Sequence, residues 1–176
     1  MQDSMIYVFD TSAFIKGMDV NVIDQSRCYT TDGVLSEIKN SFKRQRIDIS
    51  IQSRKLIIAS PSLEAVRKAK QAALQSGDLP FLSSVDIDLI ALAITLTTDV
   101  IELADNTSLL EVITDDYSIQ NVLKHLNIRI HSFMQKGIRD FIRWEIYCPV
   151  CNKIYKADKN NYCTDCEVKL KRRPIQ

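Results

Sequence analysis

Short apolar runs alternate with helix-like segments along the first 135 residues of the chain. Apolar runs bounded by polar residues predict strands at 5–9, 27–31, 55–60, 110–114 and 128–133. Helical spacing of apolar residues predicts helices at 32–42, 62–76, 84–96 and 117–126. Asp32 is a possible N-cap of the first helix, and Gly77 is expected to end the second. This alternation predicts an α/β fold in which helices cover both faces of a parallel sheet.

The length of 176 residues suits one ordinary α/β domain with a small appendage. No apolar stretch is long enough to cross a bilayer, and the N-terminus lacks a secretory signal pattern. We therefore expect a cytoplasmic protein without a membrane partner.

Four cysteines near the C-terminus form two CxxC pairs, Cys148 with Cys151 and Cys163 with Cys166. Two such pairs can hold four thiolates at tetrahedral distance, which suits a structural Zn²⁺ ion with no open coordination position. The polar segment between the pairs is too short to build a core, so metal binding must supply most of its folding free energy. Disulfides are the alternative, but no signal peptide indicates an oxidising compartment. We expect one structural zinc per chain, and Cys28 is expected to be a buried core thiol.

The C-terminal segment is also basic. From Lys136 onward the chain has ten Lys and Arg residues and five Asp and Glu residues. The net charge of this end is therefore +5, and that of the first 135 residues is −4. Basic residues attract phosphates, and tyrosines between them can stack on unpaired bases. The alternatives are that the charge serves solubility and that Tyr155 and Tyr162 pack the core of the ribbon. The residues expected to contact RNA are Lys153, Lys156, Lys159, Lys169, Lys171, Arg172 and Arg173.

The predicted division is a body at 1–135, a linker at 136–147, and a zinc ribbon with a basic tail at 148–176. Within the body, four acidic residues from distant parts of the chain are predicted to meet at one edge of the sheet. The binding crevice of a parallel sheet lies at the carboxyl ends of its strands, where the strand order reverses. Asp10 follows the first strand and Asp115 the fourth, while Glu37 and Asp86 lie early in helices that start at that edge. Clustered acids repel one another without a cation, and Mg²⁺ or Mn²⁺ prefers oxygen ligands.

Each acid also has an ordinary structural interpretation. Ser83 and Asp86 match a capping box, and Asp116 fits the N-cap of the helix from 117. Glu37 could be a solvated helix residue. Asp10 is the hardest to explain in this way, because a charge behind a buried strand is costly and small hydroxyl residues follow it.

Four blocks resemble the acidic motifs of PIN-domain nucleases, namely VFDTSAFI, VLSEI, LSSVDIDLIALA and VITDDYSIQNVL. The order of a PIN domain and a four-cysteine ribbon is similar to the Nin-one-binding protein family, endonucleases that mature the 3′ end of small-subunit ribosomal RNA. The match runs through nearly the whole chain, and the compact length resembles archaeal members. The resemblance implies a PIN-like three-layer α/β/α fold with a five-stranded parallel sheet and a small C-terminal zinc ribbon.

Carried over by position, the resemblance makes Asp10, Glu37, Asp86 and Asp115 the catalytic ligands of Mg²⁺ or Mn²⁺, with Asp115 preferred to Asp116. It implies a divalent-metal-dependent endoribonuclease that cleaves precursor 16S rRNA at its 3′ end during ribosome biogenesis. The expected partners are precursor rRNA and the assembling small ribosomal subunit, with segment 67–81 as a docking arm. Two alternatives stay open: a toxin-type PIN ribonuclease, which usually lacks a ribbon, and a non-catalytic RNA-binding assembly factor.

Overall fold

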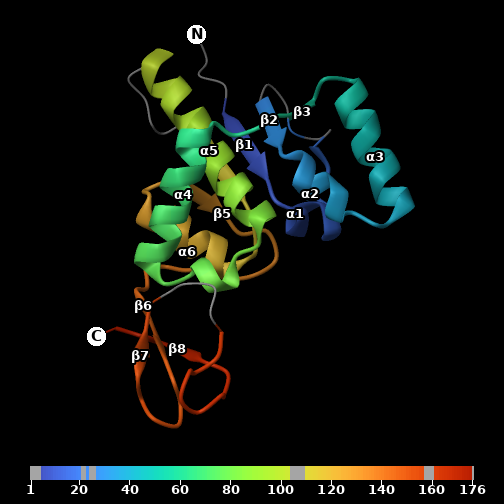
Figure 1. Ribbon diagram of the computed structural model, residues 1–176. Coiled ribbons are helices and arrows are strands. Elements are labelled where there is room, and N and C mark those ends of the chain that lie inside the picture. Colours follow the sequence, from blue (N-terminus) through green and yellow to red (C-terminus); the bar gives the residue numbers. More distant parts are fainter. Residues whose placement is uncertain (1–4, 21–22, 24–26, 104–109, 157–160, 176) are drawn as a thin grey trace.

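The computed structural model describes residues 5–20, 23, 27–103, 110–156 and 161–175 (Figure 1). Its larger part is built on a five-stranded sheet with the strand order β3-β2-β1-β4-β5. All four strand pairs are parallel, and Val8 at the centre of the sheet lies between Tyr29 and Val112. The predicted α/β fold with a parallel five-stranded sheet is therefore confirmed. The strands are β1 (Ile6–Phe9), β2 (Arg27–Thr30), β3 (Leu56–Ile58), β4 (Leu110–Ile113) and β5 (Arg129–His131).

Helices cover both faces of this sheet. The chain steps outward from β1 to β3 and then crosses back over β1 to reach β4. Because crossovers between parallel strands are right-handed, this reversal puts α1–α3 on one face and α4–α6 on the other. Figure 1 shows the two groups on opposite sides of the strands. The helices are α1 (Thr11–Ile15), α2 (Asp32–Glu37), α3 (Ser41–Gln52), α4 (Leu63–Ser76), α5 (Ser84–Leu103) and α6 (Tyr117–His125), with a short 3-10 turn, η2, at Leu79–Phe81.

The core lies between the sheet and these helices. Val8 and Phe9 of β1 and Val112 of β4 are fully buried. The segment 89–93 of α5 is at most 1% exposed. This explains why β1 and the middle of α5 read as apolar runs, since both lie in the core between the sheet and the helices. Within the residues that the structure describes, no helix combines the length and apolarity needed to cross a membrane.

The region after β2 differs from the sequence prediction. Instead of one helix at 32–42, the chain forms α2, breaks at 38–40 and starts the longer α3. The N-cap of α2 is Thr31, whose hydroxyl accepts from the Val34 amide, so the prediction of Asp32 as the cap was wrong. Helix α3 escaped prediction because its apolar side chains do not share one face. Ile47 is buried, whereas Phe42 and Ile49 are exposed.

The C-terminal part is a small three-stranded antiparallel sheet with the order β7-β6-β8. Its core consists of Ile146, Cys148, Cys163 and Leu170, with Tyr155 packed against it. Strand β6 begins at Trp144, so the segment 136–147, which we expected to be a linker, supplies the central strand of the ribbon. The strands are β6 (Trp144–Tyr147), β7 (Ile154–Tyr155) and β8 (Lys171–Pro174).

The ribbon joins the body through an ion pair whose carboxylate is buried. Arg172 donates to the carboxylate of Asp78 at 2.8 Å, and the Asp78 side chain has no solvent exposure. The guanidinium also lies over the rings of Phe81 and Trp144, 4.3 and 4.5 Å from their centroids. Asn121 donates to the other oxygen of Asp78 at 2.6 Å. Burial raises the pKa of Asp78, and the hydrogen bonds from Asn121, Ser76 and Arg172 oppose that shift.

The turn that carries Asp78 fits closely against the ribbon. Gly77 has a φ of +83°, and a Cβ built there would lie 2.4 Å from the carbonyl oxygen of Trp144. Only glycine can combine this left-handed conformation with such close contact. The segment 77–81 therefore contacts the ribbon of the same chain, and the role of 67–81 as a docking arm on rRNA or on the pre-ribosome stays a prediction.

We expect Arg172→Ala to lower the free energy of unfolding of the zinc-loaded protein by about 2 kcal/mol, because it leaves a buried carboxylate without its cation. Arg173→Ala is the matched control on the same strand, since the Arg173 pair with Glu145 is more exposed and should contribute less than about 1 kcal/mol. Urea denaturation of both variants measures the difference. Equal losses would contradict the role of the Asp78–Arg172 pair.

Candidate active site

Two neighbouring loops leave the sheet where its strand order reverses. Asp10 follows β1 and Thr114 and Asp115 follow β4, and the Asp10 amide donates to the Ile113 carbonyl at 3.1 Å. In parallel α/β sheets this reversal leaves a crevice at the carboxyl ends of the strands. The structure therefore places Asp10 and Asp115 side by side at the position predicted from the sequence.

The carboxylate of Asp10 is buried and held by three hydrogen bonds. Ser12 and Thr114 donate their hydroxyls to Oδ2 at 2.7 and 2.8 Å, and the Thr11 amide donates to Oδ1 at 2.6 Å. Burial raises the pKa of Asp10 and outweighs these hydrogen bonds, while the nearby charge of Asp86 raises it further. A cation at this carboxylate would act in the opposite direction and favour the charged form.

The same two hydroxyls join the two loops. Ser12 Oγ accepts from the Asp115 amide, and Thr114 Oγ1 accepts from the Asp116 amide, both at 3.1 Å. Each hydroxyl thus donates to Asp10 and accepts from the loop after β4. Any shift of one loop would break hydrogen bonds in the other, so the two segments form one rigid unit.

The carboxylate of Asp115 is held by a cation and by backbone amides. The Lys16 ammonium lies 2.6 Å from Asp115 Oδ2, and the Asp115 side chain is only 2% exposed. Backbone amides of Phe133, Met134 and Gln135 donate to the same carboxylate. These donors lower the pKa of Asp115 and outweigh the effect of burial, so its carboxylate is charged at neutral pH.

The loop that supplies these amides is itself fixed by a buried side chain. Gln120 donates to the Thr114 carbonyl at 2.9 Å and to Ser132 Oγ at 2.8 Å, and it accepts from the Ile138 amide at 3.0 Å. Neither Lys16 nor Gln120 was predicted from the sequence. Nothing in their local pattern indicates these roles, because the contacts of Lys16 with Asp115 and of Gln120 with Ser132 and Ile138 form only in the folded chain.

The other two acids lie at the same edge. Glu37 ends α2 and accepts a hydrogen bond from the Thr11 hydroxyl at 2.6 Å. Asp86 accepts from the Ser83 amide at 2.7 Å, and Ser83 Oγ accepts from the Asp86 amide at 3.1 Å, which confirms the capping box. Asp116 caps α6 by accepting from the Ser118 and Ile119 amides.

Carboxylate oxygens suit a hard divalent cation, so the chemistry of this edge fits Mg²⁺ or Mn²⁺. The acids do not yet form a compact ligand set. Across the described ranges, only the four cysteines bring three or more ligand atoms within 4.8 Å of one another. The structure thus connects Asp10 to Glu37 through Thr11 and to Asp115 through Ser12, while Asp86 influences Asp10 through its charge.

The four cysteines of the ribbon form a second candidate metal site. A tetrahedral Zn²⁺ with Zn–S bonds of about 2.3 Å holds its sulfurs about 3.8 Å apart, and Cys151 Sγ lies 3.8 Å from Cys163 Sγ. The amides of Cys151 and Cys166 donate to Cys148 Sγ and Cys163 Sγ at 3.5 and 3.3 Å. A hydrogen bond from the Tyr155 hydroxyl is the main reason that the pKa of Cys163 falls to about 6. The donor set is therefore compatible with zinc bound by thiolates.

The expectations for the two ribbon tyrosines and for Cys28 can also be compared with the structure. Tyr155 packs against the ribbon core, whereas Tyr162 is 58% exposed. Cys28 lies in the core of the body, as predicted, and burial raises its pKa to about 11.

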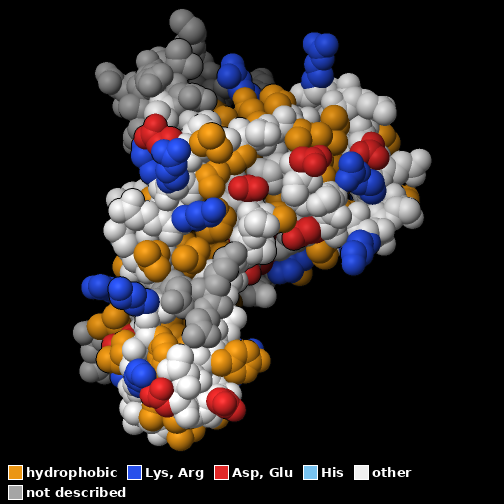
Figure 2. All heavy atoms as spheres, viewed as in Figure 1, with side chains coloured by type: hydrophobic (Ala, Val, Ile, Leu, Met, Phe, Trp, Pro, Cys, Tyr) orange, Lys and Arg blue, Asp and Glu red, His pale blue; other side chains and the backbone are white. Residues whose placement is uncertain are grey.

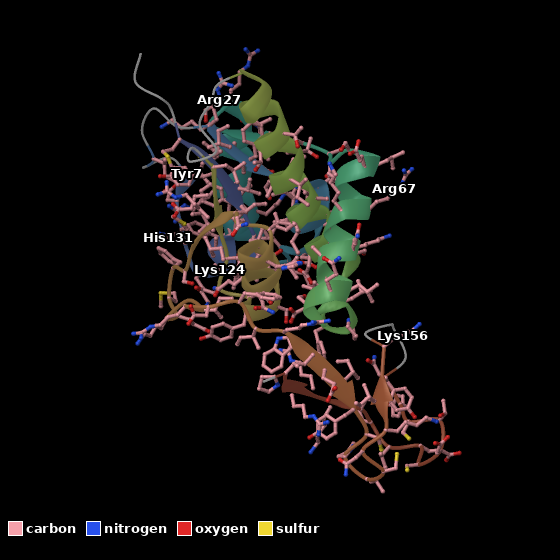
Figure 3. The ribbon with its side chains drawn as sticks, turned by 90° about the vertical axis from the view of Figure 1, so that its left-hand side faces the viewer. Tyr7, Arg27, Arg67, Lys124, His131 and Lys156 are labelled. Atoms are coloured by element: carbon pink, nitrogen blue, oxygen red, sulfur yellow. The ribbon has the colours of Figure 1, made fainter. Side chains whose placement is uncertain are left out.

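The basic residues of the ribbon have different surroundings. Lys153 pairs with Asp165, Arg173 pairs with Glu145, and Arg172 is engaged at the junction with the body. Figure 3 shows Lys156 on the ribbon, well separated from Lys124 and His131 on the body. Lys159 lies outside the described residues. The ribbon lysines that are exposed and have no acidic partner among the described ion pairs are Lys156, Lys169 and Lys171.

Comparison with known proteins identifies ribonucleases as relatives of this chain. A family profile described as "PIN domain of ribonuclease" matches residues 7–96, which include Asp10, Glu37 and Asp86. Endoribonuclease Nob1 of Pyrococcus abyssi is 33% identical over 160 residues, covering 90% of this chain and 88% of the relative. Endoribonuclease Nob1 of Methanocaldococcus jannaschii is 34% identical over 173 residues, covering 97% and 79%. Ribonuclease VapC1 of Thermoplasma acidophilum is 33% identical over 168 residues, covering 96% and 78%.

We expect native mass spectrometry to find one zinc ion per chain, because four thiolates at tetrahedral spacing bind Zn²⁺ strongly. Cys163→Ser should lose that ion and unfold the ribbon. Cys28→Ala is the matched control, since Cys28 is the one cysteine outside the ribbon, and it should keep the zinc. A chain that is purified from zinc-supplemented cells without metal would contradict this assignment.

Proposed function

This chain belongs to the Nob1 family of PIN-domain endoribonucleases, and from that premise we propose that it cleaves precursor 16S rRNA at its 3′ end during assembly of the small ribosomal subunit. The observation that carries the proposal is the buried, hydroxyl-bound Asp10 at the β1–β4 crevice, with three further acids at the same edge. Its site of action would be the cytoplasm.

The proposed catalytic residues are Asp10, Glu37, Asp86 and Asp115, which would hold Mg²⁺ or Mn²⁺. Such an ion, when bound, lowers the pKa of a water ligand and neutralises charge on the phosphate that is cleaved. Asp10 contributes a carboxylate of fixed orientation, since Ser12, Thr114 and Thr11 leave it little freedom. Asp115 contributes a charged carboxylate whose position is set by the 133–135 amides. Hydrolysis by direct attack of water would leave a 5′-phosphate and a 3′-hydroxyl.

The groups that already contact the acids indicate which carboxylate most needs a metal ion. Lys16 donates to Asp115 Oδ2, and the Ser83 amide donates to one carboxylate oxygen of Asp86 in the capping box. Asp115 thus already has an ammonium beside it, whereas the buried Asp10 carboxylate has no cation among the described ion pairs. We therefore assign Asp10 as the primary ligand.

The ribbon provides the second part of the proposal. We infer that its zinc is structural and that Lys156, Lys169 and Lys171 contribute phosphate contacts, as do Lys153 and Arg173 at the cost of their ion pairs. Arg172 would contribute by holding the ribbon to the body. This division of roles gives the acids the chemistry and the ribbon a share in recognition of the precursor.

Another candidate function is a ribonuclease without a preference for precursor rRNA. Ribonuclease VapC1 matches 96% of this chain at the same identity as a Nob1 relative, so similarity alone does not distinguish the two. A precursor-specific enzyme should cut one position near the 3′ end of 16S rRNA and leave unrelated transcripts intact. A general or toxin-type ribonuclease would degrade both and would arrest growth on expression.

We expect the protein to cleave a transcript that spans the mature 3′ end of 16S rRNA in the presence of Mn²⁺ or Mg²⁺. Asp10→Asn should slow cleavage at least about 100-fold, because several kcal/mol of transition-state stabilisation depend on the bound ion. Asp88→Asn, two residues from Asp86 on the same helix, is the matched control and should retain activity. Mapping of product ends by primer extension measures both site and rate.

The outcomes separate the possibilities clearly. Full activity in Asp10→Asn would reject the catalytic role of this residue. Absence of metal-dependent turnover in the wild-type protein would instead favour a non-catalytic RNA-binding assembly factor. Indiscriminate cutting of unrelated transcripts would favour the general ribonuclease.

A further inference from the structure

A basic, aromatic surface lies next to the acidic edge, where the end of α1 meets the start of α3. We call it the α1–α3 surface and define it by Ile15, Lys16, Lys39, Phe42 and Lys43. The segment 39–46 contains four basic residues and no acidic one. Arg44 and Arg46 pair with Asp48 and Asp19, so Lys39 and Lys43 are the cations of this segment that the surface offers. Phe42 is 67% exposed and Ile15 is 51% exposed. Figure 2 shows Lys and Arg side chains on the α3 side of the molecule, with Asp and Glu side chains among them.

The exposure of Phe42 follows from how α3 packs. Asn40 caps this helix by accepting from the Lys43 amide at 3.0 Å, which places Phe42 in the first turn. The buried face of α3 consists of Ile47 and Ser50, further along the helix. Phe42 therefore adds little to the core, and another explanation is needed for a large aromatic ring between Lys39 and Lys43.

A groove runs beside this ring, between α3 and the segment that follows α1. It has a volume of about 100 Å³, and its apolar lining includes Phe14, Met18, Phe42 and Ile47. Lys43 also lines it and donates to the Ile15 carbonyl, which ties α3 to the end of α1. An ammonium has three donors, so Lys43 can contact a phosphate as well.

The α1–α3 surface is continuous with the acids. Helix α1 starts next to Asp10 and ends at Ile15, a rise of about 7 Å. Glu37 precedes Lys39 by two residues, and Lys16 contacts Asp115. A nucleic-acid strand with one phosphate at the acids would thus have its next nucleotides over this surface.

We propose that the α1–α3 surface binds single-stranded RNA beside the phosphate that is cleaved, with Phe42 stacked on an unpaired base and Lys39 and Lys43 contacting phosphates. The inference deepens the proposed function and depends on it. Exposed aromatic rings among cations are characteristic of proteins that bind single strands, because an unpaired base offers its face for stacking. A base within a duplex is already stacked on both sides.

Charge argues for this partner over a second copy of the chain. A symmetric dimer through this surface would bring Lys39 and Lys43 of one copy close to those of the other, and like charges in contact oppose association. A phosphate backbone has the complementary charge, and the same strand can reach the acidic edge.

The test is binding of a fluorescent 12-nucleotide single-stranded RNA to the zinc-loaded chain carrying Asp10→Asn, followed by anisotropy. Adding Phe42→Ala should weaken binding about tenfold through loss of base stacking. Phe42→Trp should keep the affinity and show fluorescence quenching by RNA. Lys39→Ala should reduce the slope of log Kd against log salt by about 0.7, the value for one phosphate contact on a single strand.

Leu63→Ala is the matched control, because Leu63 is 78% exposed but lies on α4, on the opposite face of the sheet. It should bind RNA like the parent, and a duplex of the same sequence should not distinguish Phe42→Ala from the parent. Unchanged single-strand affinity in Phe42→Ala would overturn the inference, as would a change from dimer to monomer without any effect on RNA binding. Either result leaves the proposed function standing if the wild-type protein still cleaves the 16S precursor. Failure of the wild-type protein to bind or cleave RNA would overturn the proposed function itself.

Discussion

The candidate active site depends on the burial of one carboxylate between two loops. Parallel strands β1 and β4 end next to each other because the strand order reverses there, and Asp10 is the residue that follows β1. Burial alone opposes a charge at this position, and the hydroxyls of Ser12 and Thr114 only partly offset it. A divalent cation at the same edge would complete the compensation. The fold and the chemistry are therefore linked, since the crevice that buries Asp10 is also the place where Asp86, Glu37 and Asp115 arrive.

A second buried carboxylate connects the ribbon to the body. Asp78 has no exposure and accepts from Arg172 of β8 and Asn121 of α6, so it joins three separate parts of the chain. Gly77 allows Trp144 to approach the turn that carries Asp78. The rigid junction gives the zinc ribbon a defined position relative to the acidic edge.

The sequence predicted those features that follow from local pattern and from the rules of parallel sheets. The strands, the carboxyl-edge positions of Asp10 and Asp115, and the grouping of the four cysteines all depend on such rules. Helix α3 could not be predicted, because Phe42 and Ile49 face solvent and disturb the apolar periodicity. The contacts of Lys16 with Asp115 and of Arg172 with Asp78 join residues about a hundred positions apart, so only the folded structure reveals them. The segment 136–147, which we expected to be a linker, includes β6 at its end. This strand could not be predicted locally, because it forms only by pairing with β7 and β8.

The central claim, that Asp10 is the primary ligand of a divalent-metal site, is tested most directly by titrating the zinc-loaded protein with Mn²⁺ and counting free ions by electron paramagnetic resonance. Binding to the wild-type protein should weaken as the pH falls, because protons compete for Asp10, whose pKa is raised by burial. Asp10→Asn should lose this binding while its zinc and its fold remain. Equal Mn²⁺ affinity in Asp10→Asn and the wild-type protein, with no dependence on pH, would contradict the account.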